Sequence, residues 1–490
     1  YRNYCSIERD ENDAYSWAEK KDNLILVFGH THRPLWGGST HLDALDRKLH
    51  NEFALLSKLA KANKTSLKHI TLNPQKYNAE DNVDRINKIE KSIKLKSLEN
   101  GNCKAPKPQF TIGEVTNSDI TLNLNATTQY HLYHSIALFF LNGGNDCLII
   151  STGNYNAKKG VEAAELEKGI KALEVINDIN IITIPDAVQV SAIESSLLYN
   201  QILKYCETKK RFAILDIQHG DKPLSDGYVT DFKSNIISNS SSNSYGAAYY
   251  PWVVTKLYEV AKIKAEDYIT NWNKFKINTG SDIYKKAQEL IFKTISVTPP
   301  SGMMAGIYTR TDNNEGVWKA PAGKDANLMG IAELTQQLND TQNQELNAPV
   351  DGKSINCLRY FNGVGNVVWG SRTLNSNDNE YKYVPIRRLT NMLESSIKTG
   401  LNNYLFEPNI ESTWEDIEKE LNKYLNDIYR LGGLVGSKAS ESYQVSVGLN
   451  KTMTQSDIDN RMMKINVLIA PVQPAEFIIL QFEMKQISNW

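Results

Sequence analysis

The sequence predicts a multidomain protein in which an α/β domain is followed by a mixed α+β domain. Three observations support this class. The chain has 490 residues, which is more than a single hydrophobic core usually supports. In its middle part, short apolar strand patterns alternate with amphipathic runs of helical length. In its last third, helical and strand patterns are mixed, and the chain closes on two strand patterns in succession.

Residues 1–108 form the first stretch of the chain. They begin with a strand-like run, Asn23-Leu-Ile-Leu-Val-Phe28, and continue as a Lys-rich and Asn-rich helical pattern. The loop Asn100-Gly-Asn-Cys-Lys-Ala-Pro-Lys-Pro108 contains two prolines, which interrupt helices and strands. We therefore expect a domain boundary there, and we assign no role to residues 1–108 as a whole.

Residues 109–296 alternate between strands and helices. The expected strands include Cys147–Ser151, Ile181–Ile184 and Phe212–Ile217, and the expected helices include Ala163–Asn177 and Ala192–Thr208. Buried β-branched runs that alternate with helices of this length predict a parallel sheet covered on both faces. Within this domain, the run Ser238-Asn-Ser-Ser-Ser-Asn-Ser244 predicts a polar loop of low complexity.

Residues 297–374 are expected to connect the α/β domain to a C-terminal domain at 375–490. The expected strands are Asn356–Trp369, Tyr443–Gly448, Met462–Val472 and Ala475–Lys485, and the expected helices are Val384–Leu405 and Thr413–Leu431. We expect the second helix to start on Thr413 as N-cap, with acidic residues in its first turn, and to stop at Gly432-Gly433. A long apolar strand at the end of a chain needs a partner for its edge, which a neighbouring subunit could supply.

The charge balance and the cysteines exclude several classes of function. Lys and Arg total 55 against 56 for Asp and Glu, so no global field favours nucleic acid or an anionic membrane as a partner. The longest apolar runs, such as Leu24–Phe28 and Ile478–Leu480, are too short to span a bilayer, and we expect no direct membrane insertion. Five scattered cysteines without a Cys-x-x-Cys pair argue against a disulfide framework and a zinc ribbon. Synthesis in a reducing cytoplasm is expected.

The tetrapeptide Gly29-His30-Thr31-His32 directly follows a strand pattern. Two histidines two residues apart at a strand end can both reach a metal ion. This piece, over about residues 20–45, resembles the last metal-binding motif of calcineurin-like metallophosphoesterases, which implies metal ligation by His30 and His32. The other motifs of that family are absent, and no Asp-x-His occurs anywhere in the chain. A metallophosphoesterase-like hydrolase completed by residues outside this chain is the alternative function, and otherwise no metal site is predicted.

A second set of residues follows the chain order of subtilisin-type proteases. It comprises Asp186 or Asp216, then His219-Gly220, then Ser301-Gly-Met-Met-Ala305. Aligning the Gly-x-Ser-Met-Ala motif of these proteases here puts Met303 at the nucleophile position, and a methionine cannot attack a carbonyl. The chain also lacks a phosphate-binding Gly-x-x-x-x-Gly-Lys-Ser/Thr loop and a dinucleotide fingerprint. We therefore expect no enzyme activity and no cofactor.

Eleven short segments follow one another in a fixed order over about residues 110–487. They are His134–Gly144, Ile184–Asp186, Arg211–Asp216, Tyr245–Trp252, Pro299–Arg310, Gly316–Pro321, Lys353–Asn356, Val368–Thr373, Tyr383–Arg388, Phe406–Pro408 and Pro474–Ile479. In this order they resemble the tail sheath family of contractile phages and related injection systems.

The resemblance implies a structural protein that polymerises helically around an inner tube and contracts to drive the tube through a target envelope. It implies a catalytically dead, subtilisin-like doubly wound α/β domain and a C-terminal sheath domain that faces the tube. It also implies that the terminal strand is donated to a neighbouring subunit. The subunit-connecting positions would be Ala475, Phe477, Ile478, Ile479, Leu480 and Phe482.

The same resemblance implies the partners and the location of the protein. The partners are further copies of the chain, an inner tube protein, baseplate and tail-terminator proteins, and a second related sheath protein. The protein would act in a phage tail or a contractile injection particle. The candidate tube-facing helix is Thr413–Leu431, and the alternative is an ordinary solvent-facing helix with i to i+4 ion pairs. Its candidate residues are Glu415, Glu418, Lys419, Asp427 and Arg430.

Overall fold

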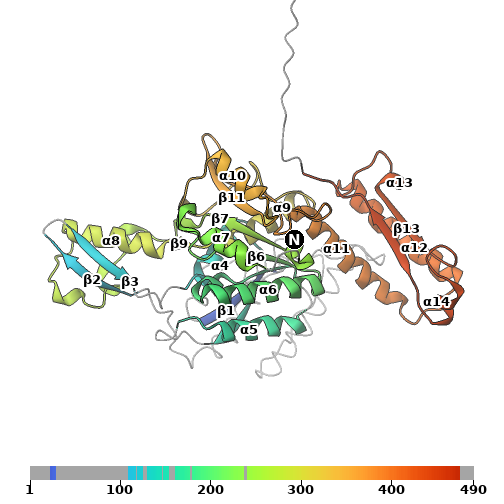
Figure 1. Cartoon of the computed structure of the whole chain (residues 1–490), viewed down its shortest axis with the longest axis horizontal. Helices are drawn as coiled ribbons and strands as arrows, with labels where there is room; N and C mark the ends of the chain where they lie inside the picture. Colours follow the sequence, from blue (N-terminus) through green and yellow to red (C-terminus); the bar gives the residue numbers. More distant parts are fainter. Residues whose placement is uncertain are drawn as a thin grey trace, which may run out of the picture.

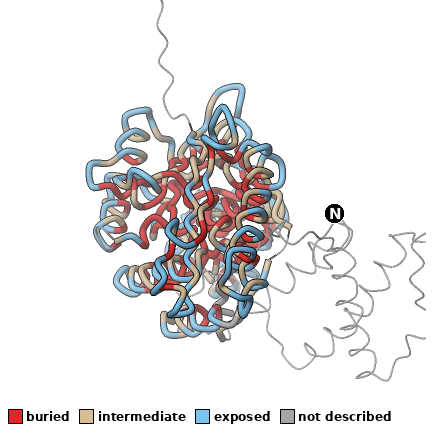
Figure 2. The backbone as a smooth tube through the Cα atoms, turned by 90° about the vertical axis from the view of Figure 1, so that its right-hand side faces the viewer, coloured by how far each residue is buried: buried red, intermediate tan, exposed pale blue. Residues whose placement is uncertain are grey.

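The computed structural model describes residues 22–28, 109–116, 119–124, 130–145, 147–153, 160–176, 179–236 and 240–474. Three lobes follow one another along the long axis of the molecule (Figure 1). An outer lobe carries β2, β3 and α8, a central α/β domain carries the largest sheet, and a C-terminal lobe carries α12, β13 and α14. Buried residues concentrate in the middle of the molecule, and exposed turns surround them (Figure 2).

The central sheet has seven strands in the order β12-β11-β7-β6-β5-β1-β4. Its strands are β1 (Asp22–Phe28), β4 (Cys147–Gly153), β5 (Ile181–Thr183), β6 (Phe212–Asp216), β7 (Gly246–Tyr250), β11 (Ile355–Phe361) and β12 (Gly365–Trp369). The four strands from β5 to β11 are parallel, whereas β12 and β1 are antiparallel to their neighbours. The α/β class is confirmed. The sheet includes β1, which precedes residue 108, and β11 and β12, which follow residue 296, so its strands come from both sides of the two expected domain boundaries.

Helices cover both faces of this sheet. One face carries α5 (Ala163–Ala172), α6 (Ala192–Lys209) and α7 (Tyr228–Asn235), and the other carries α4 (Leu132–Leu141) and α9 (Ser301–Asn314). Side chains alternate along each strand. In β6, Ala213 and Leu215 pack into the first core while Phe212 and Ile214 pack into the second. The near-continuous apolar pattern of these strands follows from burial on both faces.

Helices α4 and α9 pack closely against each other because α9 carries glycines on the shared face. A Cβ atom built on Gly302 would lie 2.5 Å from the carbonyl oxygen of Ser135, and one on Gly306 would collide with the carbonyl oxygen of Phe139. The Gly-Met-Met-Ala-Gly run therefore supports helix packing in this fold.

The outer lobe has its own core, formed by β2 (Phe110–Val115), β3 (Ile120–Leu124) and α8 (Asp282–Ile295). It joins the central domain through a three-stranded sheet of β10 (Ile331–Leu334), β8 (Val253–Thr255) and β9 (Val297–Thr298). The short helix α10 (Asp340–Asn347) precedes β11. Within the described residues, no helix combines the length and the apolar character that crossing a bilayer would require.

The C-terminal lobe packs two long helices against a two-stranded sheet. Its elements are α11 (Val384–Leu401), α12 (Glu411–Arg430), α13 (Ala439–Ser442), β13 (Tyr443–Val447), α14 (Gln455–Asp459) and β14 (Ile465–Ile469). The predicted N-cap is wrong: Ile410 occupies that position without a side-chain cap, and Thr413 is buried inside the helix. The predicted stop is confirmed, because α12 ends at Arg430 and Gly432 follows with φ +88°.

The Ser/Asn-rich run differs from the expected polar loop. Residues Ser241–Tyr245 form a 3-10 helix, and Ser242, Asn243 and Ser244 are buried. The Oγ atom of Ser244 donates to the carbonyl oxygen of Ser241 at 2.8 Å. Short polar side chains can be buried here because the turn supplies hydrogen-bond partners.

Candidate functional site

Two aspartates stand beside helix N-termini inside the central domain. Asp186 lies just after β5 and accepts a hydrogen bond from the backbone N–H of His131 at 2.6 Å, directly before α4. Asp216 ends β6 and accepts from the backbone N–H of Ser301, the first residue of α9, at 2.9 Å. Both aspartates are buried. Each therefore satisfies a donor at the N-terminus of one of the two packed helices.

Burial changes the titration of this cluster. It raises the pKa of Asp186 and of Asp216 to about 7, and the charge of Asp186 contributes to the rise at Asp216. Burial also lowers the pKa of His131 to about 3 and that of His134 to about 4. Both histidines are therefore neutral at physiological pH. Sequence reasoning did not assign a role to either histidine, because only the folded structure buries both and places the backbone N–H of His131 against Asp186.

The protease-like residues do not form a catalytic triad. Ser301 and Met303 are completely buried. His219 is exposed, and its ring packs against Tyr228 with centroids 4.6 Å apart. A serine nucleophile needs a histidine base and access to substrate, whereas Ser301 is completely buried and His219 is exposed.

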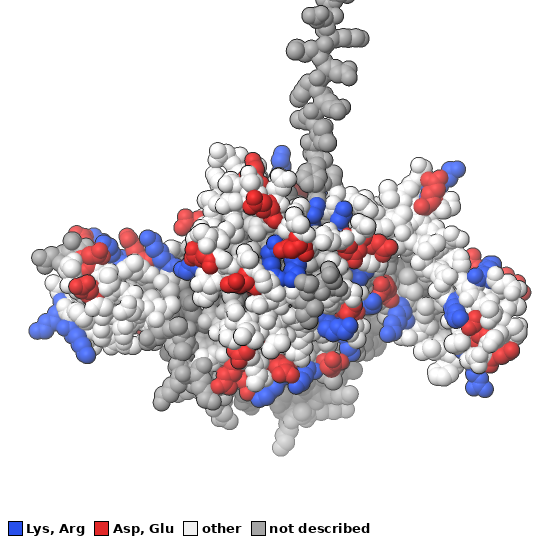
Figure 3. All heavy atoms as spheres, in the orientation of Figure 1, with Lys and Arg blue, Asp and Glu red and all other residues white. Residues whose placement is uncertain are grey.

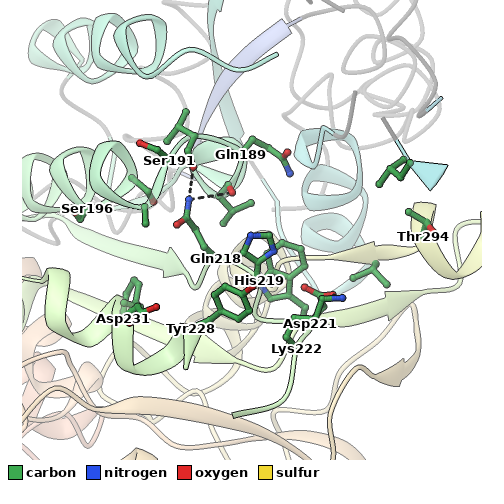
Figure 4. A pocket seen from close by; sticks show the side chains of 18 of the residues that line it. Gln189, Ser191, Ser196, Gln218, His219, Asp221, Lys222, Tyr228, Asp231 and Thr294 are labelled. Carbon is green, nitrogen blue, oxygen red and sulfur yellow. Dashed lines mark hydrogen bonds and ion pairs between the residues drawn. The ribbon is translucent and has the colours of Figure 1, made fainter. Parts of the chain in front are cut away.

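A cleft of about 850 Å³ lies beside this cluster, between the central domain and the outer lobe. His219, Asp221, Lys222 and Tyr228 contribute to its wall from the segment that follows β6 (Figure 4). The side chain of Gln218 donates to the carbonyl oxygen of Val190 and so ties this segment to the start of α6. The wall contains both acidic residues, Asp221 and Asp231, and basic residues, Lys222 and Lys293. The cleft therefore does not favour ligands of one charge sign.

A buried ion pair fastens the C-terminal lobe to the central domain. Arg388, in the second turn of α11, donates from one terminal nitrogen to Asp312 of α9 at 2.9 Å and from the other to the second carboxylate oxygen. The side chain of Asp312 is fully buried and that of Arg388 is 5% exposed. The guanidinium also lies 4.7 Å from the ring of Tyr308, whose hydroxyl is 2.6 Å from that of Tyr249. Charged, aromatic and hydrogen-bonded groups thus link the two lobes.

Helix α12 presents the predicted charged face. Glu415, Lys419 and Arg430 are exposed, whereas Glu418 and Asp427 are half-buried. Glu418 also lies 3.6 Å from the ammonium group of Lys451. The opposite face packs into the core of the lobe through residues such as Ile417, Leu421 and Leu425. On the side of the molecule seen in Figure 3, acidic and basic side chains are interspersed over this lobe.

The sheet of the C-terminal lobe contains only β13 and β14 among the described residues. They pair antiparallel, from Tyr443 opposite Ile469 to Val447 opposite Ile465. Two strands are marginal as a sheet and are stabilised by further strands or by helix packing. The predicted connecting strand and its six residues, from Ala475 to Phe482, lie outside the described residues, as do His30 and His32. In the described part of the chain, no group of three or more His, Cys, Asp or Glu side chains could hold a metal ion.

Comparison with known proteins identifies the family. A family model described as the phage tail sheath C-terminal domain matches residues 376–485. The tail sheath protein of Vibrio phage KVP40 is 28% identical over 186 residues, which is 38% of this chain and 26% of the phage protein. The match thus spans about a quarter of the length of that relative.

Two solved structures match over most of the chain. The PVC sheath complex of an extracellular contractile injection system, in its contracted state, is 29% identical with a TM-score of 0.54, and the match covers 76% of this chain and 82% of that one. The contracted helical sheath of the anti-feeding prophage is 30% identical with a TM-score of 0.52, and the match covers 72% and 81%. The chain belongs to the tail sheath family. This family is one of structural proteins, so the protease-like residues belong to a sheath fold and not to an enzyme.

Membership of the sheath family accounts for several features of the central domain. Arg388 ends one of the eleven motif segments, and its ion-pair partner Asp312 lies two residues beyond another of them, Pro299–Arg310. Asp186 and Asp216 accept hydrogen bonds from backbone N–H groups at the starts of α4 and α9, so they stabilise these helices. None of the described features favours the metallophosphoesterase alternative.

Proposed function

We propose that this chain is the sheath subunit of a contractile injection machine, which polymerises helically around an inner tube and contracts to drive the tube through a target envelope. The observation that carries this proposal is the similarity of about three quarters of the chain to a contracted sheath complex. The central domain, with its mixed sheet and buried carboxyl cluster, would be a subtilisin-like domain without catalysis.

The C-terminal lobe would connect neighbouring subunits by strand donation. Its sheet has two strands among the described residues, and both outer edges offer unpaired backbone groups there. The predicted strand Ala475–Lys485 follows β14 in the sequence and has the apolar character of a sheet strand. Insertion of this strand beside β13 or β14 of a neighbour would complete a larger sheet by β-augmentation.

The same lobe would face the inner tube through α12. Exposed Glu415, Lys419 and Arg430 offer charges of both signs, and exposed ion pairs contribute about 0–1 kcal/mol each. Weak contacts of this kind would let the sheath release the tube when it contracts. The residues 375–490 would then form the inner layer of the sleeve, and residues 109–296 would lie outside it.

Contraction would need no bound nucleotide if the extended lattice stores free energy at assembly. Subunits would rotate as rigid bodies while the donated strands keep them tethered. The remaining partners would be baseplate and tail-terminator proteins and a second related sheath protein. The particle would be a phage tail or an extracellular injection system, with its subunits made in a bacterial cytoplasm.

Negative-stain electron microscopy of the full chain, expressed alone and with its tube partner, tests this function. We expect hollow striated sleeves of uniform diameter, which become shorter and wider after triggering. A chain that ends at residue 474 should fold and yet fail to form stable sleeves, because it lacks the strand to be donated. Discrete monomers or dimers of the full chain in both preparations, under every salt condition, would contradict the sheath function.

A further inference from the structure

The C-terminal lobe carries two exposed apolar patches at its opposite ends. The loop patch consists of Leu405, Phe406, Ile410 and Met462, with exposed fractions of 62%, 104%, 52% and 45%. The helix-end patch consists of Leu431, Val435 and Leu468, with exposed fractions of 59%, 54% and 65%. Exposed apolar groups that cluster in this way mark interaction surfaces more often than single exposed residues do.

In each patch, one hydrogen bond links the two chain segments that carry its residues. In the loop patch, the side-chain amide of Asn409 donates to the carbonyl oxygen of Met462 at 3.1 Å, which joins the loop before α12 to the turn before β14. In the helix-end patch, the backbone N–H of Val435 donates to the carbonyl oxygen of Ala470 at 2.9 Å, which joins the residues after α12 to the end of β14. The patches therefore lie at the two ends of α12, whose 20 residues span about 30 Å.

Phe406 is the least expected residue of the loop patch. Its φ is +76°, a region that a bulky residue enters only at a cost. Its side chain is fully exposed, so it contributes no packing within the part of the chain that the structure describes. Asparagine would suit this backbone conformation better than phenylalanine. Neither local conformation nor the monomer core explains an aromatic side chain here, whereas a contact with another molecule would.

We propose that the loop patch of one copy docks against the helix-end patch of the next copy, with Phe406 as the central contact. The two surfaces are different and lie at opposite ends of one lobe, so their contact is head-to-tail. A head-to-tail contact that does not close on itself generates a helical array. This inference rests on the proposed sheath function, since that function supplies copies at the high density which such a contact needs.

The expected position of the donated strand supports a second copy as the occupant. Residue 474 is two residues beyond Val472, whose backbone N–H bonds to the carbonyl oxygen of Gly433 in the same region as the helix-end patch. A strand that leaves the lobe here for a neighbour's sheet would bring that neighbour next to the patch. The apolar contact and the strand exchange would then form one continuous interface.

Cysteine crosslinking in assembled sleeves tests the direction of the contact. The full chain would carry Phe406→Cys, Val435→Cys or both, and a short bis-maleimide reagent would be added after assembly. The double variant should give a ladder of crosslinked oligomers, and each single variant should give no more than the wild-type background. An equal mixture of the two single variants should give dimers as its largest new product. Dimers from Phe406→Cys alone, or no ladder from the double variant, would overturn the head-to-tail contact.

A second variant tests the contribution of Phe406 itself. Phe406→Asn should leave the melting temperature of the unassembled chain unchanged or higher, while it raises the concentration needed for sleeve assembly by about tenfold or more, as loss of an interface hot spot does. Val350→Asp, at a residue that is 102% exposed outside both patches, is the matched control and should assemble normally.

The outcomes separate this inference from the proposed strand exchange. Normal sleeves from Phe406→Asn, together with none from the chain that ends at residue 474, would overturn the patch contact and support strand exchange. The reverse result would support the patch contact alone. If the wild-type chain forms no sleeves, the same crosslinking at high protein concentration still decides whether the two patches meet.

Discussion

The buried pair of Arg388 and Asp312 should dominate the attachment of the C-terminal lobe. Arg388→Met leaves the Asp312 carboxylate, whose side chain is fully buried, without its cationic partner. Removal of one member of a buried ion pair costs about 3–5 kcal/mol, because the remaining charge is desolvated and unpaired. Replacing both members by apolar residues, as in Arg388→Met with Asp312→Leu, should recover much of that loss.

Thermal unfolding would measure these changes. For a cooperative unit of about 150–250 residues, 1 kcal/mol shifts the melting temperature by about 2–4 °C. Arg388→Met should therefore lower it by roughly 6–20 °C. The matched control is Asp340→Ala, which breaks an Arg–Asp pair of 2.8 Å whose aspartate side chain is 94% exposed. That change should cost at most about 1 kcal/mol. A small effect of Arg388→Met, or a double variant less stable than the single one, would refute the reasoning.

Three further predictions concern the central domain and α12. Burial raises the pKa of Asp216 to about 7, so the folded state holds this proton more tightly than the unfolded chain, and stability should fall as the pH rises from about 4 through 7. Urea unfolding of Asp216→Asn should show a flatter pH profile than wild type, and an unchanged profile would contradict the assignment. Gly302→Ala should lower the free energy of unfolding by about 1–3 kcal/mol, since its Cβ would meet Ser135. The control Asn313→Ala, at an exposed position on the same helix, should leave the free energy of unfolding unchanged. Equal stability of both variants would exclude the steric explanation. Charge reversal at Glu415 and Lys419 together should leave stability within about 0.5 kcal/mol of wild type and change co-sedimentation with the tube protein, whereas unchanged co-sedimentation at every salt concentration would argue against a tube-facing α12.

The locations of the main helices and strands could be predicted from the sequence. The expected strand at Phe212–Ile217 appears as β6 at Phe212–Asp216, and the expected helix at Ala192–Thr208 appears as α6 at Ala192–Lys209. The strand is a near-continuous apolar run, which is typical of burial on both faces, and the apolar residues of the helix recur at helical spacing, which indicates its buried face. The N-cap of α12 was missed because Thr413 fits the capping pattern, whereas the N-cap lies three residues earlier, at Ile410, and Thr413 is buried within the first turn of the helix.

The candidate sites were predicted less completely. The mismatch at Met303 indicated the absence of a serine nucleophile from the residue type alone. The chain order of Asp186 or Asp216, His219 and Ser301 matched that of subtilisin-type proteases but gave no role to the two aspartates, which in the structure cap α4 and α9. The buried histidine His131 carried no signal in the sequence, because a histidine near an apolar run is as compatible with a surface as with a core.

The sequence by itself determined the family resemblance, the periodicity of the elements and the lack of a nucleophile at residue 303, because each of these depends on residue types and their local spacing. The tertiary structure decided that β1 lies between β5 and β4, that Ser242 and Ser244 of the serine-rich run are buried, and that Arg388 meets Asp312 across 76 residues of chain. Strand order, desolvation and the exposure of Phe406 depend on which distant segments come together. Those contacts depend on the packing of the whole chain, which no local window contains.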